Sequence, residues 1–343
     1  MSANTIDAVR QQNELAGTSQ KDVDLATLDG FQLPADITEE FLDRMQKEIN
    51  ILGMADTMTL ARLDQDVPQF GVPQLSGSTR SEEGTRTNNS GVESGQVAFD
   101  ATDQQYYILV EPTRDALKNT HYGPDQFGDY IVDQFVQRWA NDVGLIGIRA
   151  NADTGNLQSL GGDASLDDTW DGWIAIAEGE DTESNRIGLE NTDAAEVDTM
   201  PVYDQANAAP DTQMFNEMIQ TLDSRYRDPD NAVIMMSPDK VQEYTFSLTE
   251  REDPLGSAVI FGDSDITPFS YDVMGINGWP DSYAMLTDPD NLAFGLFEEM
   301  ELEQTTDTDK VHENRLHSRN WMEGQFDFQI KQLQAGVLTT NIA

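Results

Sequence analysis

Large apolar residues recur at helical spacing between residues 123 and 148. Five of them follow one another every four positions: Phe127, Ile131, Phe135, Trp139 and Val143. This spacing puts them along one slowly drifting face of a helix. Pro124 and Asp125 suit the first turn, where a missing N–H costs little and negative charge is favoured. The pattern predicts a helix over residues 124–148, roughly 36 Å long at 1.5 Å per residue.

Shorter amphipathic stretches predict further helices. They lie at residues 4–15, 37–50, 170–176 and 215–222, and from Pro238 onward, where Ser237 is the expected cap. The first two stand on a turn-rich connector and have little nearby to pack against. We therefore expect them to dock on the main body or on a neighbouring subunit.

Alternating and continuous apolar runs predict strands between the helices. Residues 66–112 read as two long strands joined by a polar tip, Ser76 to Gly95. Arms of about 20 residues would reach about 65 Å, far beyond a body whose radius of gyration is about 20 Å. Because an isolated two-stranded ribbon is only marginally stable, we expect a neighbour to cover it.

Further strands are expected at residues 232–236, 259–261, 282–286 and 292–297 and near Ile276. Residues 182–211 read as polar and irregular. The tail from residue 298 reads as a long antiparallel ribbon that ends in AGVLTTNI. The tetrapeptide Asp-Pro-Asp-Asn occurs at residues 228–231 and 288–291, and we interpret both copies as turns. Mixed helices and strands give an α+β class.

Acidic residues dominate the charge. The chain of 343 residues has 63 acids and 20 basic residues, a net charge of -43, and six of the basic residues are lysines. Such charge strains a compact state at ordinary salt, but at molar salt the Debye length falls to about 3 Å. We interpret the composition as adaptation to high salt, in preference to an ordinary acidic protein. A basic stripe for nucleic acid is absent from the sequence.

Cysteine is absent, which excludes disulfides, thiolate catalysis and zinc-thiolate sites. Residues 1–20 lack the apolar core of a signal peptide, and the longest apolar runs, such as Val143 to Ile148, are far too short to span a bilayer. We expect a soluble chain with no membrane partner.

No motif assigns a catalytic residue or a cofactor. The histidines are His121, His312 and His317, and the last two stand five apart in a segment that reads as strand, whereas a zinc helix needs a spacing of four. The acidic turn around Asp307 and Asp309 lacks the glycine and final glutamate of a calcium loop, so any metal site is left open. Phosphate-binding glycine motifs and a serine nucleophile elbow are absent. With 63 carboxylates, paired acids carry no diagnostic weight. The expectation is a protein that is not an enzyme.

The order of these segments resembles the major capsid proteins of tailed viruses with the Hong Kong 97-type fold. The resemblance rests on LATLDGFQLPADITEEFLDRM, GVPQLSG, FGDYIVDQFVQRWANDVGLIGIRAN, DTWDGWIAIAEG, MLTDPDNLAFGLFEEMELE and FDFQIKQLQAGVLTTNI, taken in sequence. It implies an N-terminal arm over residues 1–64 and an extended β-hairpin loop over 65–112. It also implies a peripheral domain over 113–200 and 301–343 with the spine helix 124–148, and an axial domain over 201–300.

The same resemblance implies a function in assembly. Copies would form hexamers and pentamers that close into an icosahedral shell around double-stranded DNA, without sequence-specific binding. The protein would be found in the virion after assembly in the host cytoplasm. Scaffold, portal and minor capsid or decoration proteins are further possible partners. With the acidic composition, the implied source is a virus of halophilic archaea.

The sequence departs from the family at the loop. The founding member is cross-linked through a lysine there, but residues 67–100 contain no lysine, so we expect non-covalent cohesion. Arg80 and Arg86 at the tip are candidates for pairing with acids of a neighbouring subunit, and it is equally open that they only solubilise the tip.

Three alternatives remain open. An encapsulin-like compartment would enclose enzymes instead of a genome. A halophilic carboxylate-based enzyme would be a small species with turnover. A tail-tube or surface-layer subunit would form filaments or flat lattices.

Overall fold

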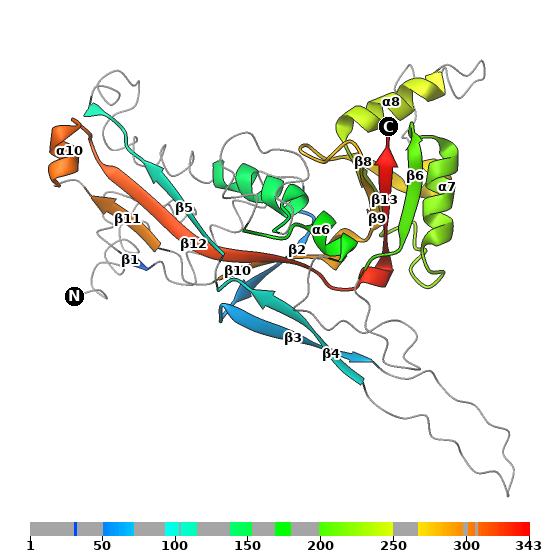
Figure 1. The fold of residues 1–343 in the computed structure, drawn as a ribbon, viewed down its shortest axis with the longest axis horizontal. Coiled ribbons are helices and arrows are strands. Elements are labelled where there is room, and N and C mark those ends of the chain that lie inside the picture. The colour runs from blue at the N-terminus through cyan, green and yellow to red at the C-terminus, as the bar shows by residue number, and fades with distance from the viewer. Residues whose placement is uncertain are drawn as a thin grey trace, which may run out of the picture.

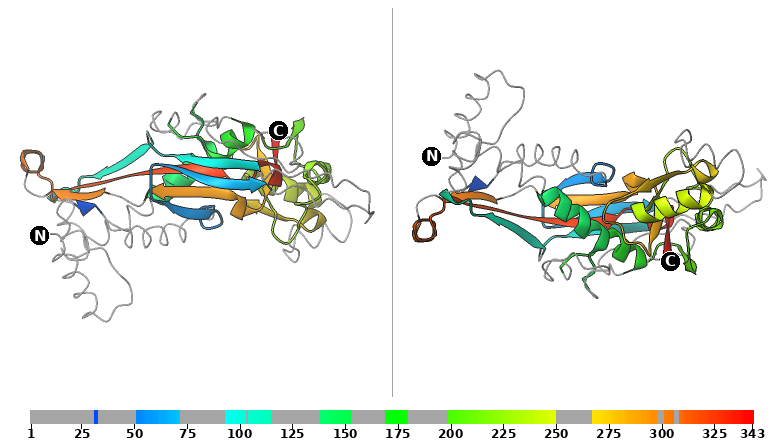
Figure 2. Two further views of the ribbon diagram at one scale, coloured as in Figure 1. Left: turned by 90° about the horizontal axis from the view of Figure 1, so that it is seen from below. Right: turned by 90° about the horizontal axis from the view of Figure 1, so that it is seen from above.

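Two β-sheets, a two-stranded ribbon and a few helices make up the structure, a computed structural model that describes residues 31–32, 51–71, 93–102, 104–114, 138–152, 169–179, 199–249, 267–297, 301–305 and 308–343. Figure 2 shows that these elements spread along one long axis, with the first sheet toward one end and the second sheet at the other. The mixture of sheets and helices agrees with the predicted α+β class.

The first sheet is built on one long strand, β12 (Arg319–Ile330). Along one edge β12 pairs antiparallel with β11 (Glu301–Thr305) and then with β10 (Leu292–Phe297). Along the other edge it pairs antiparallel with β5 (Gln105–Val110). The short strand β1 (Phe31–Gln32) extends the sheet beyond β11, and β2 (Asp56–Leu60) runs parallel to β10. Figure 1 shows β12 reaching from the centre of the molecule to the end where α10 (Asp309–Glu313) lies.

Helices cover one face of this sheet at its inner end. Phe326, Phe328 and Ile330 alternate along β12 and are fully buried. They pack with Trp139 and Val143 of a helix over residues 138–149 and with α6 (Trp173–Glu178) in one apolar cluster.

Two tryptophans fix these helical segments to the strands. Beyond Gln325 strand β5 no longer covers β12, and there the indole N–H of Trp170 donates to the Phe326 carbonyl at 3.0 Å. The indole N–H of Trp173 donates to the Ala293 carbonyl of β10 at 3.1 Å. The Trp170 and Phe326 rings also stack, with centroids 4.7 Å apart. The buried indoles thus supply apolar area while their polar groups satisfy backbone oxygens.

Close approach of the helix to the sheet depends on Gly147. A Cβ at this position would lie 2.6 Å from the Phe328 ring, which is closer than real side chains pack. Helix 138–149 continues through the glycine without interruption. The low helix propensity of glycine would favour a frayed helix end. Here Gly147 instead provides room for the Phe328 ring.

The ribbon covers the opposite face. Strands β3 (Asp64–Gly71) and β4 (Glu93–Asp100) pair antiparallel over eight residues each. At the root, Val97 and Phe99 pack with Leu60 and Ala293 in a small apolar cluster. One carboxylate oxygen of the buried Asp327 in β12 accepts from the Asp100 N–H at 3.0 Å. The inner half of β12 is therefore buried on both faces.

The second sheet has the order β6-β13-β9-β7-β8. Its strands are β6 (Val202–Ala208), β13 (Gly336–Ile342), β9 (Ala284–Thr287), β7 (Val233–Met236) and β8 (Asp272–Gly275). Helices α7 (Thr212–Thr221) and α8 (Pro238–Thr249) pack against it around a second core that includes Phe215 and Tyr244. Three short 3-10 turns complete the described elements: η2 (Pro268–Ser270), η3 (Pro289–Asn291) and η4 (Leu333–Ala335).

Two short connections join the sheets, and Asn291 ties them together. The chain passes from β9 to β10 through η3, and from β12 to β13 through η4. The Asn291 amide donates to the Thr287 hydroxyl at 3.1 Å and to the Gln332 carbonyl at 2.9 Å. Its side-chain oxygen accepts from the Gln332 N–H at 2.8 Å. All polar atoms of a buried side chain are thereby used to hold the two crossings side by side.

Many local predictions are confirmed. The helices at α7 and α8, the strands at β7, β9 and β10, and the antiparallel pairing of β11 with β12 lie where the sequence places them. The strand expected near Ile276 is confirmed as β8, which ends one residue earlier, at Gly275. The Ser237 hydroxyl accepts from the Asp239 N–H in the first turn of α8. Both Asp-Pro-Asp-Asn copies are turns in which the first aspartate accepts from the N–H two residues on. The spine helix is confirmed over residues 138–148, while residues 124–137 lie outside the described residues, as do the expected helices at 4–15 and 37–50 and the strand at 259–261.

Other predictions are wrong. The segment 312–317 does not form the expected strand, because residues 309–313 are helix α10. The stretch expected to be irregular contains β6, an edge strand whose mostly exposed polar side chains give no apolar pattern. β5 does not extend the ribbon but pairs with β12, and β13 leaves the first sheet to lie between β6 and β9. The pairing of each of these strands depends on a partner far away in the sequence.

We predict that Asn291→Asp destabilises the protein by about 3–5 kcal/mol at neutral pH. The change removes both donors and leaves a buried charge facing the Gln332 carbonyl. The loss should shrink as acid protonates the new carboxyl, which chemical denaturation at several pH values measures.

Asn231→Asp is the matched control, because it makes the same change at the same position of the other Asp-Pro-Asp-Asn turn. The Asn231 amide is exposed and donates to Asp228, so we expect a cost of about 0.5 kcal/mol. Equal losses in the two variants would contradict the role of Asn291 at the crossing.

Candidate assembly surfaces

Most of the residues singled out in the sequence lie outside the described part of the chain. Arg80, Arg86, His121 and Asp307 lie outside the described residues. His312 lies on α10 and His317 follows it, in an arrangement unlike two histidines on one helical turn. Within the described ranges, no group of three or more potential ligands could hold a metal ion.

Strands β5, β11 and the outer half of β12 form a sheet, and one face of it carries the exposed ring of Tyr107 stacked on the half-buried ring of Trp321. Tyr107 is 63% exposed and Leu109 is 36% exposed, while the intervening Ile108 points the other way, toward the core. The Tyr107 ring stacks on Trp321 with centroids 4.8 Å apart and planes 2° from parallel. We call Tyr107, Leu109 and Trp321 the aromatic platform. Sequence analysis did not identify the platform, because the run QYYILV does not specify which face of the strand the core covers.

Acidic side chains surround the platform. The Arg319 guanidinium pairs with the Glu111 carboxylate at 2.6 Å. Glu323 accepts from the Trp321 indole N–H at 2.8 Å. Glu303 of β11 stands opposite Trp321 in the strand register and accepts from the Thr305 hydroxyl. These three acids and one arginine give the rim a net charge of -2.

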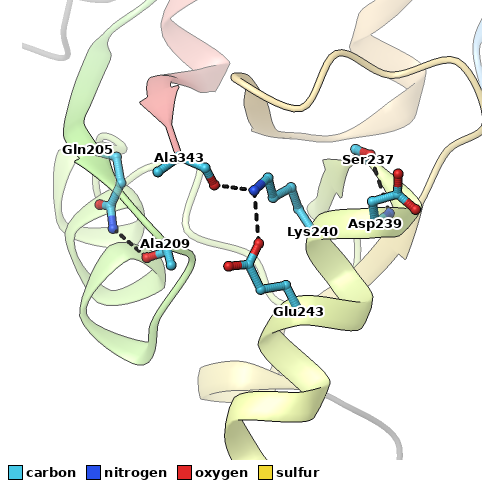
Figure 3. Close-up of polar contacts among 7 residues, drawn as sticks. All are labelled: Gln205, Ala209, Ser237, Asp239, Lys240, Glu243 and Ala343. Atoms are coloured by element: carbon cyan, nitrogen blue, oxygen red, sulfur yellow. Dashed lines mark hydrogen bonds and ion pairs between the residues drawn. The ribbon is translucent and has the colours of Figure 1, made fainter.

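A second set of polar contacts fixes the end of β13 (Figure 3). The Lys240 ammonium of α8 donates to the Ala343 backbone oxygen and to the Glu243 carboxylate. The Ala343 N–H donates to the Ala208 carbonyl at 3.1 Å, just beyond the bend where Gln205 donates to Ala209. The Lys240 side chain is only 14% exposed. The contacts therefore tie α8, β6 and the final strand into one unit.

The contact between the two halves of the molecule includes a half-buried carboxylate. Glu178, the last residue of α6, accepts a hydrogen bond from the Tyr283 hydroxyl just before β9. Burial raises the pKa of Glu178, and the hydrogen bond from Tyr283 opposes this only in part. Burial, with the nearby Glu178 charge, raises the pKa of Tyr283 to about 12. Arg149 of helix 138–149 donates to the Gly278 carbonyl in the same loop.

The similarity of this chain to known proteins is found in its fold and not in its sequence. No protein-family model matches the sequence, and no curated protein does. Among solved structures, the chain is similar to a chain of the satellite phage P4 procapsid, a particle that includes the size determination (Sid) protein, with 14% identity and a TM-score of 0.63. That match covers 100% of this chain and 98% of the other. The chain has the fold of phage capsid chains.

Two further structures support the same fold. A chain of the cyanophage A-1(L) capsid has 12% identity and a TM-score of 0.57, over 96% of this chain and 98% of that one. A chain from the capsid of the native GTA particle has 11% identity and a TM-score of 0.58, over 85% of this chain and 89% of that one. In the described part of the chain, no helix is long and apolar enough to cross a membrane.

In this capsid fold the Glu178 contact should make stability depend on pH. Because the folded pKa lies above the unfolded value, the folded state holds the proton more tightly, and stability falls as pH rises through the folded pKa. Glu178→Gln keeps an acceptor for Tyr283 and removes the charge. We expect it to be more stable than wild type at neutral pH and equal to it in acid.

The measurement is the free energy of unfolding from about pH 3.5 to pH 8. Glu313→Gln, at an exposed position of α10, controls for the general benefit of removing one negative charge. The prediction would be contradicted if Glu178→Gln raised the free energy of unfolding equally at every pH, or by no more than the control variant does.

Proposed function

We propose that this protein is the major capsid protein of a tailed virus with the Hong Kong 97-type fold. Many copies assemble as hexamers and pentamers into an icosahedral shell that encloses double-stranded DNA. The observation that carries the proposal is the match to a phage procapsid chain over the whole length of both chains. A shared insert or single motif would not cover 98% of the other chain.

The flat shape supports this reading. A sheet covered by helices on one face and a ribbon on the other makes a plate, and β3–β4 leaves that plate as an extension (Figure 1). In the proposal residues 1–64 are the arm, 65–112 the extended loop, 113–200 with 301–343 the peripheral domain, and 201–300 the axial domain. Arg80 and Arg86 of the loop pair with a neighbouring subunit.

Halophilic archaea are the proposed hosts. Cations are few in this sequence, and several of them bind backbone oxygens: Arg114 contacts the Leu316 carbonyl, and Arg227 contacts those of Leu222 and Gln220. These cations are bound to backbone oxygens, and the net charge of -43 remains after every basic residue has been counted. Dissolved salt must then screen the excess carboxylates. Assembly takes place in the host cytoplasm, with scaffold, portal and minor or decoration proteins as further partners.

The main alternative is an encapsulin-like compartment with the same fold, and a halophilic carboxylate-based enzyme is the alternative from another class. Electron microscopy of the protein purified in molar salt separates them. We expect closed shells, and particles from infected cells should contain double-stranded DNA. Shells filled with protein cargo would favour the compartment, and a small species with turnover would favour the enzyme.

Lowering the salt should dissociate the shell. Dialysis from molar salt to about 0.1 M lengthens the Debye length from about 3 Å to about 10 Å, so carboxylates across subunit contacts repel one another. Light scattering and sedimentation measure the loss of particles.

Replacing the salt by sucrose at the same osmolality is the control. Sucrose does not screen charge, so particles should be lost there too. Shells that stay intact in dilute buffer would show that charge screening does not hold them together.

A further inference from the structure

The loop between β8 and β9 contains the one Asn-Gly dipeptide of the sequence, Asn277–Gly278. The Trp279 N–H donates to the Ile276 carbonyl at 3.1 Å, so the dipeptide forms the two central residues of a tight turn. Gly278 has a φ of 88°, as the third position of a type II turn requires. Asn277 is exposed to solvent.

We propose that Asn277 is a site of spontaneous deamidation through a cyclic imide, and that the isoaspartate product loosens the contact between this loop and helix 138–149. The reacting groups belong to one chain, so the modification does not depend on the proposed assembly.

The reaction consumes only water. The backbone nitrogen of Gly278 attacks the side-chain carbonyl carbon of Asn277 and forms a new N–C bond, in an intramolecular step. The C–N bond of the side-chain amide breaks, and the amide nitrogen leaves as ammonia with the proton that Gly278 has lost. Water then opens the five-membered imide at either carbonyl group. One opening gives aspartate, and the other gives isoaspartate, whose main chain runs through the side-chain carbons.

Both reacting groups of this turn are available. Among the described residues, no hydrogen bond holds the Asn277 side chain or the Gly278 N–H. Glycine also adds no Cβ to shield the attacking nitrogen. The Arg149 guanidinium binds the carbonyl of the same glycine, so its charge stabilises the negative charge that develops on that nitrogen.

A related pair, Asp171–Gly172, shows the opposite arrangement. The Asp171 carboxylate accepts from the Ala152 N–H at 2.8 Å, and the Gly172 N–H donates to the Ala150 carbonyl at 2.9 Å. Ring closure at this pair would require both hydrogen bonds to break. Folding therefore protects Asp171–Gly172 and leaves Asn277–Gly278 open to reaction.

Isoaspartate at residue 277 would disturb a closely packed contact. A Cβ on Gly278 would collide with the Leu145 side chain, which shows how near the loop lies to helix 138–149. The additional main-chain carbon shifts Gly278, whose carbonyl accepts from Arg149 of the same helix. The next residue, Trp279, is only 2% exposed and has little room to follow. The modification therefore weakens the junction between the two halves of the molecule.

Peptide mapping by mass spectrometry measures the reaction. The folded protein in molar salt and the chain unfolded in guanidinium are aged side by side in water enriched in heavy oxygen, which labels each ring opening. We expect folded Asn277 to lose ammonia at least about ten-fold faster than Asn231, a ratio equal to about 1.4 kcal/mol in barrier height. Asn231 is the internal control, because it is exposed, precedes an alanine and donates to Asp228 at 3.0 Å.

Asn277→Gln is the matched variant for the effect on the junction. Its longer side chain closes only to a six-membered ring, so it should not react during the same incubation. Wild type and variant are aged together, and the free energy of unfolding is measured at intervals. We expect the wild type to lose stability in proportion to its isoaspartate content, and Asn277→Gln to keep its initial value.

The outcomes separate the modification from its effect. If Asn277 stays intact in the folded protein while it reacts in the unfolded chain, or reacts no faster than Asn231, the site is overturned. Isoaspartate that forms without a loss of stability relative to Asn277→Gln overturns the effect on the junction and leaves the modification standing. Neither result bears on the capsid function, which electron microscopy tests.

Discussion

Burial of β12 on both faces is the constraint on which the rest of the structure depends. On one side, alternate aromatic residues of its inner half meet the two indoles that also bind the sheet backbone. On the other, Asp327 accepts the N–H of Asp100 and anchors the ribbon root. A strand covered in this way cannot slip by one residue, because a slip would exchange Phe326 with Asp327 and bury a carboxylate among the rings. The register of β12 thus sets the positions of the helices, the ribbon and the neighbouring strands together.

The same strand carries the molecule beyond its own core. Past Gln325 toward residue 319 the pairing with β5 and β11 continues, but that part of the sheet shows Tyr107 and Leu109 to solvent. Extending a sheet into solvent with an exposed aromatic ring does not stabilise a monomer. In the proposed assembly, this extension would present Tyr107 and Leu109 to a neighbouring subunit while the buried half of β12 fixes its register. One strand thereby combines a rigid anchor with an outlying contact surface.

Sequence reasoning succeeded where local chemistry decides structure. The Ser237-Pro238 start of α8, the apolar stripe of α7 and the two Asp-Pro-Asp-Asn turns depend on residues within a few positions. It failed where a distant partner decides. β6 has mostly polar, exposed side chains and is a strand because β13 pairs with it. The role of Asn291 was equally hidden, since Asn231 occupies the same place in the same motif and remains at the surface. The exposure of Tyr107 depends on which face of β5 the core covers, which the run QYYILV does not specify.

Charge connects this fold to its proposed environment. Repulsion between like charges destabilises a compact monomer with a net charge of -43. In a shell of such chains the same repulsion would also act across every subunit contact. Contacts that persist in these conditions should rely on groups that salt does not weaken: backbone pairing as in the ribbon, apolar area, and flat stacking of the Tyr107–Trp321 kind. Ion pairs such as Arg319–Glu111 are partly exposed and contribute little to stability when salt screens them. Salt therefore has two opposite effects, since it removes the repulsion that prevents assembly and weakens the ion pairs that would guide it. Aromatic and main-chain contacts are what remains to specify which surfaces meet.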